Sequence, residues 1–246
     1  MLLNYFLSIF LKFLAVLKVH NPSYSYEYRP ISVLLVLSKL FEKVLYHRVY
    51  SYLTEHNLFD KRQYGFRENH STEPAVTAIY DELLKNFDNT LIRCSLFPDL
   101  SKAFDCCDQD ILLDKLYHRG LKDVSHKLFS RFVHIRMQCT KEGEFKSSYK
   151  VISCEVPQGS VISPLLVYIY INNITKMSSF HTNLFDDDIN LHISNSCFDA
   201  LQTAVNLERC KFDPWLRANK LSLNYNKTNL CYYILKNTSL LHWKSL

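Results

Sequence analysis

Three consecutive aspartates, Asp186, Asp187 and Asp188, are the side chains of this sequence best suited to chemistry. They lie in the stretch HTNLFDDDINLH, residues 181–192, where apolar residues that favour strands flank a short acidic turn. This pattern predicts a β-hairpin with carboxylates at its tip. Neighbouring carboxylates repel one another unless a cation or a basic group offsets their charge. The stretch is therefore either a cation site or a solvated acidic turn.

A fourth aspartate, Asp99, ends the apolar segment LIRCSLFPD, residues 91–99, which has the composition of a strand. An aspartate at the end of one strand, together with paired aspartates at a hairpin tip, is what a two-metal phosphoryl-transfer site needs. Such a site holds two Mg²⁺ ions about 3.5–4 Å apart, and Mg²⁺ binds carboxylate oxygens and water. The sequence supplies these ligands, but their spacing alone does not show that the two strands are neighbours.

The elements that must position these carboxylates begin with two amphipathic helices. The first follows Pro30, and its predicted core face is Leu37, Leu40, Phe41, Val44, Leu45, Val49 and Tyr52. The second follows the loop at residues 63–74, where Ser71 or Thr72 can cap it. Its predicted buried stripe is Val76, Ile79, Tyr80, Leu83 and Leu84.

The remaining elements alternate between strand and helix patterns. The pattern predicts a turn or short helix at 101–105, helices at 111–119 and 124–136, a hairpin at 137–156, a turn at 157–160, a helix around 164–177, a helix at about 198–216 and a strand at 230–235. Together with the acidic hairpin, this order predicts an α+β fold, with an antiparallel sheet backed by helices on one face.

Composition narrows the class of protein. Hydrophobic residues make up 48% of the 246 residues, enough for one large domain or two small ones, and only four glycines argue against a Gly-rich nucleotide-binding fold. The net charge of +5 permits a polyanionic partner without requiring one. Eight cysteines without a C-x-x-C pair match neither a zinc pattern nor a disulfide framework. The sequence therefore favours a reducing compartment, nuclear or cytoplasmic.

The first 17 residues, MLLNYFLSIFLKFLAVL, form an apolar run. Asn4, Ser8 and Lys12 interrupt it, no basic region precedes it, and a spanning helix needs about 20 mostly apolar residues. A buried helix or a frayed start is the favoured interpretation, and a signal peptide or short anchor is the alternative. Four N-x-S/T sequons would matter only in a secreted chain; they start at Asn69, Asn173, Asn226 and Asn237.

Six stretches, in one order along the chain, resemble the reverse transcriptase domain of non-LTR (LINE-like, jockey-like) retrotransposons. They are YRPISVLLVLSKLFEKVLYHRVYSYL (28–53), QYGFRENHSTE (63–73), DLSKAFD (99–105), VPQGSVISPLLVYIYINN (156–173), LFDDDINL (184–191) and WLRANKLSLNYNKT (215–228). The resemblance implies a right-hand polymerase, with an apolar N-terminal segment at 1–20, fingers mainly at 21–90, palm mainly at 91–235 and a C-terminal tail at 236–246. It also implies that the thumb is missing from these residues.

The resemblance assigns the metal ligands. Asp99 matches the first metal-binding aspartate of the family, and Asp187 and Asp188 match the pair in the F-x-D-D motif. In such enzymes these carboxylates are catalytic, because they hold two Mg²⁺ ions where the primer 3′-hydroxyl attacks the α-phosphate of an incoming dNTP.

Further residues match family positions that contact the nucleotide or the template. Arg29 resembles the fingers arginine that grips the triphosphate, and Phe104 resembles the steric gate that crowds a ribose 2′-hydroxyl. Lys227 lies where the family has a lysine near the triphosphate. The loop that lies against template and dNTP corresponds to Pro157, Gln158 and Gly159. The structural alternative for Phe104 is a core aromatic residue, and for Lys227 it is a solvated lysine. For the loop it is a turn without a binding role.

Two departures from the family pattern lie beside the predicted site. Pro98 precedes Asp99, and a proline inside a central strand would remove one ladder hydrogen bond. Asp186 replaces a small apolar residue and adds a third negative charge beside the metal pair.

The sequence therefore favours an RNA-directed DNA polymerase domain whose partners are an RNA template, a DNA primer and dNTP, without a stable membrane partner. A non-catalytic nucleic-acid-binding remnant is the alternative, and a secreted or membrane-anchored protein is less favoured.

Overall fold

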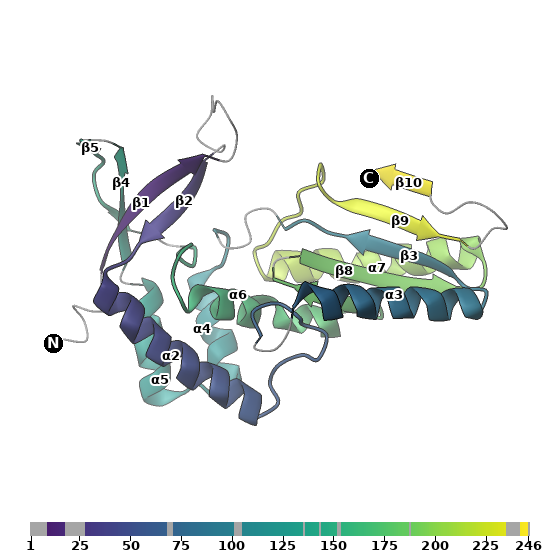
Figure 1. The fold of residues 1–246 in the computed structure, drawn as a ribbon, viewed down its shortest axis with the longest axis horizontal. Helices are drawn as coiled ribbons and strands as arrows, with labels where there is room; N and C mark the ends of the chain where they lie inside the picture. The colour runs from purple at the N-terminus through teal and green to yellow at the C-terminus, as the bar shows by residue number, and fades with distance from the viewer. Residues whose placement is uncertain are drawn as a thin grey trace. The chain divides into compact units, whose positions relative to one another are not determined.

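The computed structural model describes residues 9–17, 28–67, 71–100, 105–134, 136–142, 144–151, 154–186, 188–234 and 242–245. The chain forms two compact units of helices and strands (Figure 1). Unit 1 contains Met1–Leu58 and Phe104–Tyr170, and unit 2 contains Phe59–Ala103 and Ile171–Leu246. The expected α+β class is confirmed. The units have other boundaries than the expected fingers and palm segments, and that division of the chain stays a prediction.

The sheet of unit 1 contains the N-terminal strand β1 (Ile9–Leu17). This strand pairs antiparallel with β2 (Tyr28–Val33) and parallel with β4 (Arg136–Glu142). Strand β4 also pairs antiparallel with β5 (Phe145–Lys146) and β6 (Lys150–Val151). The prediction of a helix is wrong for residues 9–17, because the strands β2 and β4 complete the backbone hydrogen bonds of this apolar run.

No helix in the described part of the chain combines the length and the hydropathy that a membrane span requires.

The helices of unit 1 are α2 (Val36–Glu55), α4 (Gln109–His118), α5 (Asp123–His134) and α6 (Ser163–Ile171). The Asp108 carboxylate caps α4 by accepting a hydrogen bond from the Ile111 backbone N–H at 3.0 Å. Helix α6 is apolar on all sides, and its residues 165–171 are all buried. The predicted helices at 111–119, 124–136 and around 164–177 are thus confirmed, with shifted ends.

The predicted core face of α2 is wrong in part. Leu37 and Leu40 are 58% and 60% exposed, and Val44 is also exposed. The buried residues of the helix are Ser38, Glu42, Leu45, Val49 and Leu53. The helix is rotated from the expected orientation because the Glu42 carboxylate is buried against residues 160 and 161, where it accepts two hydrogen bonds.

Unit 2 is built on an antiparallel sheet in the order β10-β9-β3-β8-β7. Its strands are β3 (Ile92–Phe97), β7 (His181–Phe185), β8 (Asp188–Asn195), β9 (Asn229–Tyr233) and β10 (His242–Ser245). The unit also contains α3 (Thr72–Asp88), α7 (Phe198–Ala218) and the short 3₁₀ helix η2 (Asn172–Lys176). The predicted acidic hairpin and the predicted strands at 91–99 and 230–235 are confirmed.

The two faces of this sheet differ in chemistry. Side chains alternate along a strand, so Cys94 and Leu96 point to one face and Arg93 and Ser95 to the other. We call these the apolar face and the polar face. Helix α7 packs on the apolar face, where its Phe198 ring lies 5.1 Å from that of Tyr232. Helix α3 lies on the polar face, and Figure 1 shows the two helices on opposite sides of the sheet. The expectation that helices back this sheet on one face alone is therefore wrong.

The predicted buried stripe of α3 is also wrong in part, because only Ile79 and Leu83 of its five residues are half-buried. Val76 and Tyr80 are 64% and 57% exposed, Leu84 is exposed, and among the described residues of this helix only Ala75 is fully buried. The physical reason is that α3 faces polar side chains of the sheet, so it does not bury an apolar stripe. Ser71 occupies the N-cap position, but its side chain makes no capping hydrogen bond.

Candidate active site

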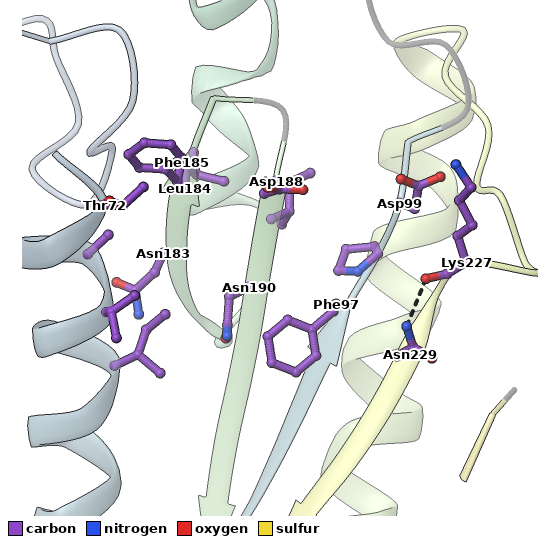
Figure 2. A pocket seen from close by; sticks show the side chains of 15 residues that line it. Thr72, Phe97, Asp99, Asn183, Leu184, Phe185, Asp188, Asn190, Lys227 and Asn229 are labelled. Carbon is purple, nitrogen blue, oxygen red and sulfur yellow. Dashed lines mark hydrogen bonds between the residues drawn. The ribbon is translucent and has the colours of Figure 1, made fainter. Parts of the chain in front are cut away.

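A cavity of about 560 Å³ lies at one end of the polar face of the sheet. Asp99 and Asp188 both line it, together with residues of α3 and Lys227 (Figure 2). The two aspartates come from the ends of β3 and β8, which are hydrogen-bonded neighbours. The structure thus brings together two of the three predicted metal ligands and one predicted nucleotide-binding residue.

The backbone of Asp99 is held on both sides. Its N–H donates to the Thr228 hydroxyl at 3.2 Å, and its carbonyl accepts from the Asn224 N–H at 2.8 Å. Strand β3 ends at Phe97, so Pro98 follows the last ladder residue. The expected loss of a ladder hydrogen bond at Pro98 is therefore wrong, because the proline terminates the strand and does not interrupt it.

The hairpin that carries Asp188 has a two-residue turn. Phe185 pairs with Asp188, which leaves Asp186 as the first loop residue. Asp187 lies outside the described residues. Asp186 has a φ of 55°, and two-residue hairpin turns of types I′ and II′ require a positive φ at this first loop position. Aspartate tolerates this conformation better than most residues, which gives the departure at position 186 a conformational reason.

The hairpin tip also packs against Gly65. A Cβ added at Gly65 would lie 2.0 Å from the Asp186 backbone nitrogen and 2.3 Å from its Oδ1. The surrounding segment runs along β7, since the Tyr64 N–H donates to the Leu184 carbonyl at 2.8 Å and the Leu184 N–H donates to the Arg62 carbonyl at 2.9 Å. Glycine is therefore required at position 65 for this close approach.

Residues around Asp60 anchor that segment. Burial raises the pKa of Asp60, but hydrogen bonds from the Thr175 hydroxyl and the Arg62 backbone outweigh this effect and hold the pKa below its ordinary value. Arg67 donates from NH1 to the carbonyls of Asp60 and Gln63, at 3.2 and 3.3 Å. These contacts give Arg67 a structural role in its own loop.

The floor of the cavity carries two amides that sequence reasoning missed. Asn183 and Asn190 are cross-strand partners, 6% and 5% exposed, and both line the cavity. Asn183 Nδ2 and both side-chain polar atoms of Asn190 have no hydrogen-bond partner among the described residues. The alternation of side chains along the strands could have indicated these amides, because it places Asn183 and Asn190 on the face opposite to Leu191. Such buried polar atoms favour a polar ligand or water in the cavity.

The predicted template loop lies in unit 1 and forms a turn. Gly159 has a φ of 102°, as the third residue of a type II turn requires, and the Ser160 N–H donates to the Pro157 carbonyl at 3.2 Å. The Gln158 carbonyl accepts from the Ser32 N–H at 2.7 Å. A Cβ at Gly159 would lie 2.9 Å from the Ser32 carbonyl oxygen.

Two carboxylates fix the same loop. Gln158 Nε2 donates to Asp105 Oδ1 at 2.7 Å. Glu42 Oε2 accepts from the Ser160 hydroxyl at 2.7 Å and from the Val161 N–H at 2.8 Å. These hydrogen bonds fix the conformation of the loop, so it is not a bare solvated turn.

The remaining predicted residues are placed only in part. The backbone of Arg29 lies in β2, but its side chain is outside the description. Phe104 lies outside the described residues altogether. Lys227 is exposed, and its carbonyl accepts from Asn229 Nδ2 at 3.0 Å (Figure 2).

A second polar cluster lies on the same face, at the other end of β7 and β8. Glu82 Oε2 of α3 lies 2.6 Å from His192 Nε2 and 3.9 Å from Arg93 NH1. The hydrogen bond from His192 holds the pKa of Glu82 below its ordinary value. Burial lowers the pKa of His192 in spite of the carboxylate beside it. The cluster therefore favours an ionised Glu82 next to a neutral imidazole at neutral pH.

Comparisons with known proteins agree on one family. Residues 19–243 match the family described as reverse transcriptase (RNA-dependent DNA polymerase). The chain is 28% identical over 242 residues to the probable RNA-directed DNA polymerase from transposon BS of Drosophila melanogaster, covering 90% of this chain and 26% of that protein. It is 25% identical over 223 residues to the probable RNA-directed DNA polymerase from transposon X-element of the same organism, covering 85% and 24%. The resemblance to non-LTR retrotransposon reverse transcriptases is thus confirmed.

The chain spans about a quarter of the length of these relatives. Among solved structures it is similar to telomerase from Candida albicans, determined in complex with the TWJ fragment of telomeric RNA. The TM-score is 0.64 at 12% sequence identity, and the match covers 94% of this chain and 42% of the telomerase chain. At this identity the similarity establishes the fold alone.

Proposed function

Because the chain belongs to the reverse transcriptase family, we propose that it is the polymerising part of an RNA-directed DNA polymerase of the non-LTR retrotransposon type. The observation that carries the proposal is the placement of Asp99 and Asp188 on one cavity, at the ends of two paired strands. Carboxylate oxygens are the ligands that Mg²⁺ prefers, so this pair fits the metal that nucleotidyl transfer uses.

Asp99 and Asp188, together with Asp187, would hold two Mg²⁺ ions. When bound, the metal supplies charge neutralisation at the phosphates and lowers the barrier to attack by the primer 3′-hydroxyl on the dNTP α-phosphate. The protein contributes position. Thr228 and Asn224 fix the backbone that carries the first carboxylate, and the short hairpin turn fixes the second.

The nucleotide has further contacts in this proposal. Lys227 is exposed on the same cavity as the aspartates, where its ammonium group can approach a triphosphate. Arg29 would grip the triphosphate from the fingers, and Phe104 would exclude a ribose 2′-hydroxyl. The loop of Pro157, Gln158 and Gly159 would lie against template and dNTP, and its hydrogen bonds in unit 1 give it a defined shape.

The partners in this proposal are an RNA template, a DNA primer and dNTP. We place the protein in the nucleus or cytoplasm, because all eight cysteines are free thiols and such thiols suit a reducing compartment. The fingers at 21–90 and the palm at 91–235 remain the proposed functional division.

Primer extension on an RNA template with Mg²⁺ tests the proposal. Asp99→Asn and Asp188→Asn should each lower the extension rate by about 10²-fold or more, because each removes a carboxylate that would hold the metal ions, and these ions would neutralise the reacting phosphates. Asp213→Asn is the matched control, since Asp213 is exposed on α7 and does not line the cavity. It should extend primers at the rate of the unaltered protein.

Equal extension by the unaltered protein and both cavity variants would exclude the proposed site. Salt-dependent binding to an RNA–DNA hybrid without any extension would instead favour the non-catalytic remnant, because phosphate contacts alone produce such binding.

A further inference from the structure

Two histidines and a glutamate meet on the polar face of the sheet, at the end away from the hairpin tip. Glu82 comes from α3, His181 from β7 and His192 from β8. One ligand atom from each side chain can be chosen so that all three lie within 4.8 Å of one another. We propose that these three side chains form a second metal site, for a divalent transition metal of the zinc class, distinct from the proposed Mg²⁺ site.

The donor set selects this class of metal. Zn²⁺ binds imidazole nitrogen readily, and a site of two histidines and one glutamate leaves a fourth tetrahedral position for water. Mg²⁺ prefers oxygen ligands throughout, so it is a poor match to two imidazoles. The three donors at this end of the sheet therefore differ in kind from the carboxylates at the other end.

The register of the sheet builds the pair of imidazoles. His181 and His192 are direct cross-strand partners, so both side chains project on the same face. Their ring centroids lie 5.4 Å apart, with planes inclined by 17°. The Glu82 carboxylate approaches from the helix above, 2.6 Å from His192 Nε2. Helix and hairpin thus bring the three donor side chains together.

The site has an entrance and room for water. A cavity of about 350 Å³ is lined by all three side chains, and His181 is exposed to solvent. His192 is 3% exposed, and its Nδ1 has no hydrogen-bond partner within the part of the chain that is described. A buried imidazole nitrogen without a protein partner, beside an open cavity, is a polar group available to water.

Positively charged side chains near the site limit its affinity for a divalent metal ion. Arg93 lies 3.9 Å from Glu82, and Lys85 lines the same cavity. The imidazole nitrogen that faces Glu82 can carry either a proton or a metal ion, so a metal ion bound at this nitrogen requires the neutral ring to carry its proton on Nδ1. Once bound, the metal would join α3 to the β7–β8 hairpin, whose other end carries Asp186–Asp188.

Cobalt and zinc titrations of the 246-residue chain, stripped with chelator and kept reduced, test the site without nucleic acid or dNTP. Co²⁺ should bind with visible absorption bands of nitrogen and oxygen ligation, and Zn²⁺ should displace it. His181→Ala and Glu82→Gln should each weaken this binding by about tenfold or more. His118→Ala is the matched control, because His118 is exposed and 3.4 Å from the Asp114 carboxylate but belongs to no such cluster among the residues that the structure describes. It should leave the affinity unchanged.

A thermal unfolding series gives the second readout. Zn²⁺ should raise the melting temperature of the unaltered protein and of His118→Ala, and this shift should disappear in His181→Ala. Since His181 is exposed, its replacement should leave the fold intact. Absence of uptake, binding that His181→Ala does not alter, or a cobalt spectrum showing only thiolate charge-transfer bands would each overturn the proposal.

Discussion

Both faces of the unit 2 sheet contain deeply buried side chains, but these side chains differ in chemistry between the two faces. On the apolar face Cys94, Leu96 and Leu191 are 0%, 3% and 0% exposed. On the polar face Arg93 and His192 are 1% and 3% exposed. An antiparallel sheet commonly turns its polar face to water, but here α3 covers part of that face. Burial alone therefore does not distinguish the side that holds the fold together from the side that can bind ligands.

Buried polar atoms without hydrogen-bond partners distinguish the polar face from the apolar face. On the polar face Asn183, Asn190, His192 and Arg93 each have a buried side-chain atom without a hydrogen-bond partner among the described residues. Each such atom costs about 1–3 kcal/mol of stability, a cost that natural proteins accept mainly at functional sites. Both the cavity of Asp99 and the Glu82–His181–His192 cluster lie on this face. The apolar face should thus govern stability, and the polar face should govern binding.

The largest stability effect is expected on the apolar face. Leu191→Ala should lower the free energy of unfolding by about 2–5 kcal/mol, because it removes a fully buried side chain and leaves a cavity. Urea denaturation followed by circular dichroism measures this value. Leu207→Ala on α7 is the control, since Leu207 is 61% exposed and its replacement should change stability by less than about 0.5 kcal/mol. A loss below about 1 kcal/mol at Leu191 would contradict the assigned role of this face.

A smaller loss is expected on the polar face. Arg93 donates from Nε to the Ser95 hydroxyl at 3.2 Å and from NH1 to the Ile79 carbonyl at 3.3 Å. Arg93→Met should cost about 1–3 kcal/mol, because these acceptors and Glu82 lose their donor. Combining it with Glu82→Gln in a double-mutant cycle, read by urea denaturation, separates the ion-pair contribution. A cost as large as that of Leu191→Ala would show that both faces carry the fold equally.

A pH-dependent effect should be smaller still. The pKa of His192 lies below its ordinary value of 6.5 through burial, although Glu82 raises it and Arg93 and His181 lower it further. As pH falls through 6.5 the unfolded chain takes up a proton before the folded chain does, so the free energy of unfolding decreases. The lowered pKa of Glu82 acts in the same direction below its ordinary value of 4.5.

Unfolding curves of the unaltered protein and His192→Gln, measured between pH 7.5 and pH 4 with a chelator present, isolate this contribution. The other carboxylates titrate in both proteins and cancel in the difference. The unaltered protein should lose more stability on acidification than the variant. Parallel curves would show that His192 does not contribute.

The smallest effect is expected for a conservative substitution at the hairpin tip. Asp186→Asn should change the free energy of unfolding by less than about 0.5 kcal/mol, because asparagine adopts a positive φ as readily as aspartate does. Asp186→Val should cost about 1–3 kcal/mol, since a β-branched residue is strained in this conformation. If thermal or urea unfolding showed equal losses for both, charge and not backbone conformation would explain the residue at this position.

The sequence was sufficient to predict the acidic hairpin, strand β3 and the helices, and to select Asp99 and Asp188, which lie on one cavity. It was not sufficient to predict which faces of α2 and α3 are buried. Apolar spacing identifies an amphipathic helix, but a partner distant in the chain sets its rotation: Glu42 is buried because Ser160 reaches it. In the same way, β1 is a strand because β4, more than 100 residues later, supplies one of its neighbours.

The close approach of Gly65 to Asp186 has a consequence for how sequences of this kind decay. A single methyl group at position 65 would collide with the backbone of a turn that is distant in the chain, although no aspartate would have changed. Among related copies, one that keeps all of its carboxylates but has lost this glycine would have a displaced hairpin tip. The geometry of the hairpin tip in such a copy therefore depends on the glycine at position 65 as much as on the acidic residues.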